Sequence, residues 1–408
     1  MHKSYEFEQI IVKIYLFDTT IIHENLLPLS FTRPVADFRC GILTIREKWE
    51  KYLPGDYDYY PVDYLRDAFG NVENPSEEGI FISGNILPRP EIADFISKLN
   101  SGEALMEDEQ PLIFRGSLNQ WEKGELKAKK SDIEIPRLVY VFDIFLNNGE
   151  EIKRDFEILT KGRKSMPLPD CTRMLYSGPQ QDKEQSESLV FIEEGAVVEC
   201  ATINVKEGPV YIGKNAVLME GACIRGPFAL CEGAKVRMGA KIYEATTIGP
   251  YCKMGGEISN AVIFGYSNKS HDGYLGNAVI GEWCNIGAGT NASNLKNDYS
   301  KIRVWNYHTK TFMRTDLQFC GLIMGDHSKI GVNSMINTAT VIGVGVNIHG
   351  AGFPRTFVPC FSEGSATSGF STVPLKKFFD TMERVMSRRE LKPSEKEIRL
   401  LTHIYQQS

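Results

Sequence analysis

The second half of the chain repeats an aliphatic residue or a methionine at every sixth position. An amphipathic helix would repeat apolar positions every three or four residues, and a strand would repeat them every two. A period of six is typical of short strands joined by tight corners, coiled so that each apolar residue stacks on its equivalent one turn later. The pattern predicts a left-handed parallel β-helix from about Phe191 to Phe353. Its longest unbroken run is Ile212, Leu218, Ile224, Leu230, Val236, Ile242, Ile248 and Met254.

The neighbours of these apolar positions fit the interior and the corners of a narrow coil. The fourth residue after the apolar one is usually small or β-branched, as at Ala216 and Ala222. Glycine often follows the apolar residue directly, as at Gly213 and Gly249. We expect these glycines to supply the positive φ that a tight corner needs.

Two polar segments interrupt the repeat. The first is Gly265–Tyr274, and the second, Ser293–Phe319, alternates enough to form a β-hairpin. In a solenoid such insertions leave the coil and collect on one face, often the working face. We therefore expect both segments to project from the β-helix and to carry its chemistry.

The first half of the chain alternates apolar runs with segments of helical spacing. This alternation is typical of an α/β domain with a largely parallel sheet. The expected strands are Ile11–Asp18, Gly79–Leu87 and Leu138–Leu146, and the expected helices are Ile42–Leu53, Pro90–Asn100 and Glu150–Thr160.

The domain boundaries follow from changes in pattern. A polar stretch without apolar period, SGPQQDKEQSES, follows Tyr176 and is the best linker. After Phe361 the six-residue period ends, and two amphipathic helices are predicted at Leu375–Arg389 and Ser394–Tyr405, the second with Ser394 as N-cap. We expect an α/β domain over 1–187, the β-helix over 188–362 and a helical extension over 363–408.

Composition and charge exclude several classes of protein. The 408 residues carry a net charge of −6, and no basic stretch indicates a nucleic-acid partner. The apolar runs are too short for a membrane span, and the N-terminus does not read as a signal peptide. The nine cysteines form no C-x-x-C pair, and the seven histidines have no metal-ligand spacing. We expect a reduced, cytoplasmic protein without structural zinc.

The segment GYSNKSHDGYLGNAVIGEWCNIGAGTNASN (Gly265–Asn294) resembles the bifunctional bacterial enzymes that acetylate glucosamine 1-phosphate and then uridylylate the product. Those enzymes have G-x-x-S-K-x-x-H-x-x-Y-L-G-D-A-x-I-G-x-x-x-N-I-G-A-G-T-x-x-x-N at this stage of their β-helix. The resemblance extends to GPFA at Gly226–Ala229 and covers most of the β-helix. Generic hexapeptide proteins share the period but not this spacing of histidine, tyrosine and asparagines.

The resemblance implies a role for each matched side chain. Acetyl transfer from a thioester to an amine needs a base, and a histidine with a pKa near roughly 6.5 suits that task. By resemblance His271 is this base, while Tyr274, Asn285 and Asn294 bind the sugar phosphate or the acetyl group. Ala288 and Gly289 lie where the family's backbone meets acetyl-CoA, and an N–H there would stabilise an oxyanion. His327 and His349 match no motif, so we expect them to be structural.

The charges that grip the sugar phosphate in the family are displaced in this chain. The arginine expected directly after GPFA is Leu230, and the phosphate-binding lysine aligns with Ser259. An anion needs positive charge more than a fixed position. The candidates to replace these charges are Arg225, Arg237, Lys253 and Lys269. The acceptor could therefore be a different sugar phosphate or nucleotide sugar.

The segment LPLSFTRPVADFRCGILTIREKW (Leu27–Trp49) and FISGNILP (Phe81–Pro88) resemble sugar-phosphate nucleotidyltransferases. The Gly-rich phosphate loop of that family is absent, and Asn85 stands in place of its metal-binding aspartate. Two interpretations stay open: a divergent nucleotidyltransferase that uses UTP and Mg²⁺, or a degenerate domain kept for packing or regulation. Under the first, the nucleotide and metal residues would be Arg33, Arg39, Lys48, Asn85, Asp18 and Asp143.

The whole pattern resembles an alternate, divergent form of this bifunctional enzyme, with both halves in the same order. It implies acetyl transfer from acetyl-CoA to an amino-sugar phosphate, with a second step that would form a UDP-sugar. It also implies a homotrimer, since β-helix acyltransferases of this kind bind acetyl-CoA between neighbouring subunits. Two alternatives remain: a nucleotidyltransferase whose β-helix is only an assembly platform, and a non-catalytic sugar-nucleotide sensor.

Overall fold

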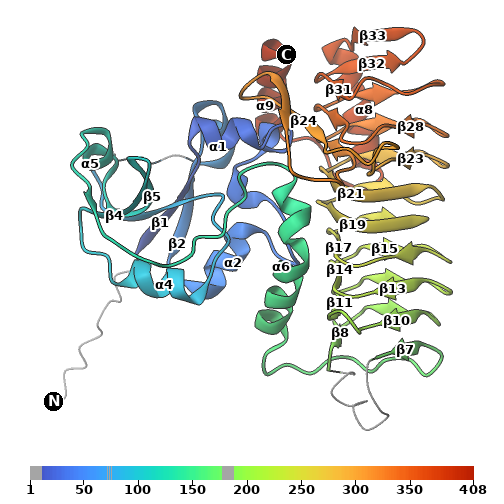
Figure 1. Ribbon diagram of the computed structural model, residues 1–408, viewed down its shortest axis with the longest axis horizontal. Coiled ribbons are helices and arrows are strands. Elements are labelled where there is room, and N and C mark those ends of the chain that lie inside the picture. The colour runs from blue at the N-terminus through green and yellow to red at the C-terminus, as the bar shows by residue number, and fades with distance from the viewer. Residues whose placement is uncertain (1–11, 71, 73, 75, 177–187) are drawn as a thin grey trace.

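The computed structural model describes residues 12–408 except 71, 73, 75 and 177–187. The predicted linker lies outside the described residues. So does most of the N-terminal segment that we expect not to be a signal peptide. Figure 1 shows an α/β domain beside a tall column of stacked strands, with two C-terminal helices packed near the column's C-terminal end. The predicted α/β domain, left-handed parallel β-helix and C-terminal helices are confirmed.

The N-terminal domain is built on a six-stranded mixed sheet in the order β2-β1-β3-β5-β4-β6. Three of its strand pairings are parallel, and β5 is antiparallel to both of its neighbours. The strands are β1 Lys13–Phe17, β2 Asp56–Tyr60, β3 Gly79–Ser83, β4 Glu103–Glu107, β5 Gln110–Gly116 and β6 Lys127–Ala128. The helices are α1 Thr20–Asn25, α2 Ile45–Tyr52, α3 Arg66–Phe69, α4 Pro90–Ser97, α5 Leu118–Glu122 and α6 Asp143–Thr160.

The predicted strand at Leu138–Leu146 is wrong. The chain turns after Leu138, and α6 begins at Asp143, because the Asp143 carboxylate accepts hydrogen bonds from the N–H groups of Val139 and Tyr140 at 2.7 and 2.8 Å. The buried residues of α6 recur every three or four positions, as in a helix with one covered face. A buried helix start and a buried strand have the same apolar composition over a short run, so the sequence did not separate them.

The β-helix has three faces made of parallel strands stacked along the column, except that the terminal strand Gly369–Thr372 runs antiparallel to Ser362–Ser365. The first face holds β8 Val190–Ile192, β11 Val210–Ile212, β14 Phe228–Leu230, β17 Thr246–Ile248, the ends of β19 Glu257–Ile263 and β21 Tyr274–Ile280, β26 Ile323–Met324, β29 Val341–Ile342 and β31 Phe357–Val358. The second holds β9 Val197–Val198, β12 Val217–Leu218, β15 Lys235–Val236, β18 Lys253–Met254, β20 Asn268–Lys269, β22 Asn285–Ile286, β27 Lys329–Ile330, β30 Asn347–Ile348, β32 Ser362–Ser365 and β33 Gly369–Thr372. The third holds β7 Arg173–Leu175, β10 Thr202–Asn204, β13 Cys223–Arg225, β16 Lys241–Ile242, the starts of β19 and β21, β23 Asn291–Ala292 and β28 Met335–Ile336.

The residues of the six-residue repeat form the interior of this column. All eight from Ile212 to Met254 are at most 1% exposed, and they pack into one apolar core. The glycines after them have a different role from the expected one. Gly249 does not have a positive φ; a Cβ there would lie 1.3 Å from the carbonyl oxygen of Phe264 in the next coil. These glycines therefore permit close stacking of coils, while positive φ falls two residues later, as at Tyr251.

The first predicted interruption does not leave the coil. Within Gly265–Tyr274, β20 pairs with β18 before it and β22 after it, so this segment is a regular part of the second face. It looked like an insertion because this coil is short: Met254 stacks on Lys269, whereas Val236 stacks on Met254. Because this coil has fewer residues, the six-residue count is shifted. In addition, Lys269 occupies the interior position where an apolar residue is expected.

The second interruption does leave the coil, as the hairpin β24 Arg303–Asn306 and β25 Thr311–Arg314. It packs on the N-terminal domain. His308 lies 2.7 Å from Glu24, and the rings of Tyr307 and Phe31 meet edge to face at 5.4 Å. The insertion therefore holds the two halves of the molecule together.

Helix α6 lies between the N-terminal sheet and the first face of the β-helix (Figure 1). The Asn148 amide donates to the carbonyl of Ala245, and its oxygen accepts from the N–H of Gly41, both at 2.7 Å. Apolar residues of both halves form one continuous core, in which Phe38 contacts Phe264. The strands of the column continue past residues 188 and 362, since β7 and β33 pair into it. The expected domain limits stay a prediction.

The C-terminal helices are α8 Leu375–Ser387 and α9 Glu395–Gln407. Ser394 caps α9 in a capping box with Glu397, as predicted. Both helices pack on the upper coils through a cluster that includes Phe361, Phe378 and Leu401. Within the described part of the chain, every helix is too short or too polar to cross a membrane.

A buried ion pair between the halves generates the first prediction. Arg33 is 8% exposed and pairs with Asp326 and with Glu282, which lies 3.1 Å away. We expect Arg33→Met to lower the free energy of unfolding by about 3–5 kcal/mol, because it leaves the buried carboxylate of Asp326 without its counter-charge. Urea titration measures this loss.

The matched control is Arg399→Met, which removes the exposed pair with Asp67 at 2.9 Å. This pair should contribute less than about 1 kcal/mol. Equal losses of unfolding free energy in the two variants would contradict the claim that the Arg33 ion pair stabilises the contact between the two halves.

Candidate functional site

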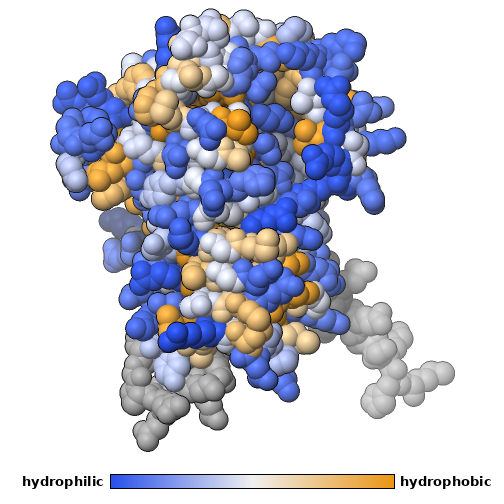
Figure 2. Space-filling model, turned by 90° about the vertical axis from the view of Figure 1, so that its right-hand side faces the viewer, coloured by the Kyte–Doolittle hydropathy of each residue, from blue (hydrophilic) through white to orange (hydrophobic). Residues whose placement is uncertain are grey.

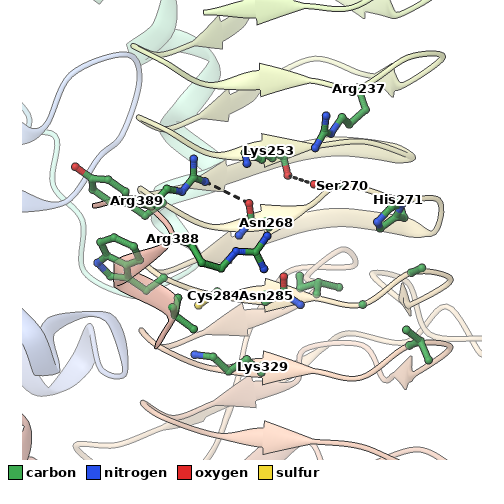
Figure 3. A pocket seen from close by; sticks show the side chains of 17 residues that line it. Arg237, Lys253, Asn268, Ser270, His271, Cys284, Asn285, Lys329, Arg388 and Arg389 are labelled. Atoms are coloured by element: carbon green, nitrogen blue, oxygen red, sulfur yellow. Dashed lines mark hydrogen bonds between the residues drawn. The ribbon is translucent and has the colours of Figure 1, made fainter. Parts of the chain in front are cut away.

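A pocket of about 670 Å³ opens on the second face of the β-helix, beside the C-terminal end of α8. It extends across the face: Figure 3 shows Arg388 and Arg389 on one side and His271 at the opposite corner. The residues that line it are Arg237, Lys253, Tyr266, Asn268, Ser270, His271, Trp283, Cys284, Asn285, Ile286, Gly287, Ala288, Lys329, Val332, Val385, Arg388 and Arg389.

The strand register places the polar side chains of this pocket in one column. Lys253, Asn268, Asn285 and Lys329 are successive partners on β18, β20, β22 and β27. Adjacent strands are spaced by about 4.8 Å, so the two lysines flank two neutral amides at fixed intervals. Such a column offers an extended ligand a positive charge at each end and two hydrogen-bonding amides between them.

Positive charge dominates this pocket. Five cationic side chains line it, and no carboxylate does so among its described lining residues. Burial lowers the pKa of Lys253, and the neighbouring charges of Arg389 and Arg237 lower it further. Burial also lowers the pKa of Lys329 to about 8. The lowered pKa values show that these lysines lie where a positive charge is disfavoured. A ligand with more than one negative group would relieve this repulsion.

His271 is an exposed residue at the corner that follows β20. Its corner stacks on the next one, because the Gly289 N–H donates to the carbonyl of Asp272 at 2.9 Å. The imidazole therefore lies at the mouth of the pocket and close in the coil to Ala288 and Gly289. The N–H of Ala288 has no acceptor among the described residues, whereas its neighbours Gly287 and Gly289 donate to the adjacent coils. That amide is available to a ligand.

Lys269 does not reach the pocket, although we expected it to bind phosphate. Its side chain is 1% exposed and points into the β-helix interior. The ammonium donates to the carbonyl oxygens of His271 at 2.8 Å and Gly255 at 3.2 Å. Because Lys269 occupies an interior stacking position, a substrate cannot contact it from the second face.

Tyr274 and Asn294 lie on the third face, around the corner from the pocket. The Asn294 amide donates to the Tyr274 hydroxyl at 2.9 Å and to the Asn277 side chain at 2.7 Å. Arg225 also lies on the third face, three strands from Tyr274, where it pairs with Glu244 at 3.5 Å. Within one chain, the structure thus groups His271, Asn285 and Ala288, and separates Tyr274, Asn294 and Arg225 from them.

The basic residues predicted to bind a nucleotide are used inside the fold. Arg33 forms the interface ion pair, and Arg39 donates to the carbonyl of Ile42 and lies 3.8 Å from Glu47. Lys48 is 1% exposed and pairs with Glu151 and with Asp155, the latter at 3.1 Å. Each of these cations already has buried or half-buried partners, so none is free for a triphosphate.

The two predicted metal-site residues are also satisfied internally. Asn85 accepts from Ser83 at 2.8 Å and donates to the carbonyl of Leu138 at 2.9 Å, and the Asp143 carboxylate accepts from the N–H groups of Val139 and Tyr140. Within the described ranges, no group of three or more His, Cys, Asp or Glu side chains has a geometry that could hold a metal ion.

Asp18 has a different setting, at the carboxyl edge of the sheet. It lines a second pocket of about 760 Å³, together with His23 and Tyr64. Burial raises the pKa of Asp18 to about 7, against a hydrogen bond from the Val35 N–H, and burial lowers the pKa of His23 to about 4. Helix α9 forms one wall of this pocket, where the ring of His403 stacks on Tyr64 at 5.0 Å.

The sequence missed three contributions to the first pocket. Arg388 and Arg389 come from the end of α8, and Trp283 stacks on Tyr266 at 4.3 Å along the pocket wall. The paired arginines are visible in the sequence as a dibasic end of an amphipathic helix. Their position against β18 and β20 depends on how that helix packs, which no local pattern reveals.

A family model described as sugar nucleotidyl transferase matches residues 14–164. The bifunctional protein GlmU of Synechococcus sp. (strain CC9311) is 32% identical over 143 residues, which are 35% of this chain and 27% of that protein. A bifunctional sugar-1-phosphate nucleotidylyltransferase/acetyltransferase of Sulfurisphaera tokodaii is 26% identical over 294 residues, 68% of this chain and 65% of that protein. The chain spans roughly a quarter of the first of these relatives.

Two solved structures are similar to part of this chain at low identity and low TM-score. The polySia-specific acetyltransferase NeuO has 16% identity and a TM-score of 0.25, over 50% of this chain and 88% of NeuO. AntD, an N-acyltransferase from Bacillus cereus in complex with dTDP and 3-hydroxybutyryl-CoA, has 13% identity and a TM-score of 0.23, over 52% and 98%. By the family model and the curated relatives, the chain resembles a GlmU-like bifunctional protein: a sugar nucleotidyl transferase domain followed by a hexapeptide β-helix.

Proposed function

We propose that the pocket on the second face transfers an acetyl group from acetyl-CoA to the amine of an amino-sugar phosphate, with glucosamine 1-phosphate as the first candidate. The observation that carries this proposal is the meeting, in one pocket, of an exposed histidine and five cations without a carboxylate. The histidine suits a proton transfer, and the cations suit a donor and an acceptor that both carry phosphate.

The shape of the pocket supports an extended donor. The column from Lys253 to Lys329 and the arginines of α8 lie across the face from His271 (Figure 3). A donor whose phosphates bind at the α8 side would reach with its thioester toward the corner at His271 and Ala288. There the free Ala288 N–H is suited to stabilise the oxyanion of the tetrahedral intermediate.

The reaction at the corner follows from this arrangement. The acceptor attacks the thioester carbonyl carbon as the neutral amine, and the His271 imidazole takes the proton that the nitrogen loses as the C–N bond forms. The C–S bond then breaks, and the proton passes from His271 to the thiolate, which leaves as the thiol. Asn285 lies on the same face and offers an uncharged amide to the acetyl group or to a sugar hydroxyl.

Nucleotidyl transfer is a second candidate function, favoured by the family model over residues 14–164. We place it in the pocket at the carboxyl edge of the sheet, beside Asp18, since ligands of α/β sheets bind at that edge. UTP with Mg²⁺ would be the co-substrates. The buried positions of Arg33, Arg39 and Lys48 give this candidate less support than acetyl transfer has.

Prediction for the base: we expect His271→Ala to reduce acetyl transfer by about 10²- to 10⁴-fold, because the acceptor loses its general base. Thiol release from acetyl-CoA with glucosamine 1-phosphate is followed with a chromogenic thiol reagent. His349→Ala is the matched control, since His349 is exposed at the same kind of corner after β30. Undiminished turnover in His271→Ala would refute the base assignment.

Product identification belongs to the same assay. Mass spectrometry of mixtures with acetyl-CoA, several amino-sugar phosphates and each nucleoside triphosphate with Mg²⁺ identifies acceptor and nucleotide. Pyrophosphate release without acetylation would favour a nucleotidyltransferase on a β-helix platform. Tight binding without any turnover would favour a sensor.

Prediction for the donor: we expect Arg388→Ser to raise the KM for acetyl-CoA about tenfold with little change in kcat, because one charge-assisted contact to phosphate is worth about 1.5 kcal/mol. Steady-state kinetics over a range of ionic strength measure this effect, which should shrink as salt rises. Arg384→Ser is the control, since Arg384 is exposed one turn earlier on α8 and does not line the pocket. Equal effects in both variants would remove α8 from the donor site.

Prediction for the assembly: we propose a homotrimer, in which the third face of one chain, with Tyr274 and Asn294, meets the pocket of a neighbour. Met238 and Val332 are 65% and 68% exposed on the β-helix. Figure 2 shows hydrophobic residues among hydrophilic ones on the side of the molecule that lies to the right in Figure 1. Sedimentation equilibrium should give about three times the chain mass of 45.9 kDa. A single 45.9 kDa species would contradict the proposal.

A further inference from the structure

A lysine occupies a position inside the β-helix where its counterparts are apolar. The interior column of the second face runs Leu218, Val236, Met254, Lys269, Ile286, Ile330 and Ile348. Lys269 is 1% exposed, as buried as the Met254 on which it stacks. A methionine of similar length would fill the same space without a charge.

The two acceptors of the Lys269 ammonium are both backbone oxygens. One is the carbonyl of His271, at 2.8 Å, and the other is the carbonyl of Gly255, at 3.2 Å. The corner at Gly255 and the corner at His271, on successive coils, are therefore joined by one cation. A Cβ on Gly256 would lie 2.9 Å from the ammonium and 2.8 Å from the His271 oxygen, so the corner is closed tightly around it.

Keeping this charge inside the coil costs stability. Burial lowers the pKa of Lys269 to about 8, partly opposed by the nearby charge of Asp272. A group whose pKa is lowered on folding destabilises the fold at pH values below the folded pKa, because the unfolded state binds the proton more tightly. At pH 7 the charge on this lysine therefore counts against the fold. By contrast, the buried Lys48 has two carboxylate partners.

The corner is also the place where the coil is shortest. Met254 and Lys269 are stacking partners, and so are Val236 and Met254. The coil that ends at Lys269 therefore has fewer residues than the one before it, and its corners must close over a smaller loop. A cation that joins the two corners fixes the backbone from which the imidazole of His271 projects.

We propose that Lys269 is a positioning residue that holds the backbone of His271 so that its imidazole faces the pocket. The proposal rests on the proposed acetyl transfer for its kinetic consequence, but not for its structural one. It assigns the lysine neither contact with substrate nor proton transfer. The lysine acts through the carbonyl of His271 alone.

The test is Lys269→Met in the full-length protein. We expect kcat for acetyl transfer to fall about 10- to 100-fold with the KM for acetyl-CoA unchanged, because a displaced base loses alignment while the cations of the pocket remain. At pH 7 we expect the midpoint of thermal unfolding to stay the same or to rise, because the buried charge is gone. A purely structural lysine would give the opposite: a lower midpoint.

A third measurement does not depend on activity. Diethyl pyrocarbonate modifies accessible imidazoles, and peptide mass spectrometry assigns its rate to His271. We expect this rate to increase in Lys269→Met, since the corner loses the hydrogen bond from the ammonium to the His271 carbonyl. Lys206→Met is the matched control, because Lys206 is exposed between β10 and β11, on a different coil from this corner, and it should change none of the three measurements.

The outcomes separate the two proposals. If the wild-type protein releases no thiol, acetyl transfer fails, while the unfolding midpoint and the modification rate still test the lysine. If wild-type turnover is present, an unchanged kcat in Lys269→Met overturns the positioning role. A lower unfolding midpoint, or a variant that does not fold, also overturns it, because the lysine would then be an ordinary structural residue.

Discussion

The parallel hydrogen bonds between successive coils determine where every side chain of the β-helix lies. They fix one outward and one inward residue of each second-face strand at intervals of about 4.8 Å. The outward column then reads Lys253, Asn268, Asn285 and Lys329, and the inward column holds Met254, Lys269 and Ile286. A pocket on such a face inherits its spacing from the backbone. Cations on it cannot move apart to relieve their repulsion, which is why an anionic ligand suits it.

The same constraint explains why the N-terminal domain is docked so firmly. The first face of the β-helix is apolar, and it is covered by α6 and by the segment around Phe38. Residues that resemble nucleotide ligands have structural partners instead: Arg33 pairs with Asp326 across this contact, and Lys48 pairs with Glu151 inside the N-terminal domain. These carboxylates offset part of the cost of burying the two charges. The match to a sugar nucleotidyl transferase family is therefore compatible with a domain whose basic residues serve its fold and its docking.

Much of the architecture could be predicted from the sequence because it depends on repetition. The six-residue period identified the interior from Ile212 to Met254, and the capping signal at Ser394 identified the start of α9. The prediction was wrong where a short stretch of sequence is compatible with two different structures. An apolar run before Glu150 was assigned to a strand and is the start of α6, and a shortened coil was taken for an insertion. The pocket was predictable at His271 and Asn285, which a motif places, but not at Arg388, which depends on packing across distant parts of the chain.

The two buried lysines differ in a way that separates fold from function. Lys48 lies among Glu151, Asp155 and the nearby Arg89, so its charge is balanced in a network that holds α2 to α6. Lys269 has only backbone oxygens, and its lowered pKa records an unbalanced charge. A fold under selection for stability alone would place an apolar residue there, as it does in the coils on either side. The charged exception is Lys269, whose ammonium binds the backbone carbonyl of His271, the exposed histidine of the pocket. We therefore relate the loss of stability at Lys269 to the function of this site.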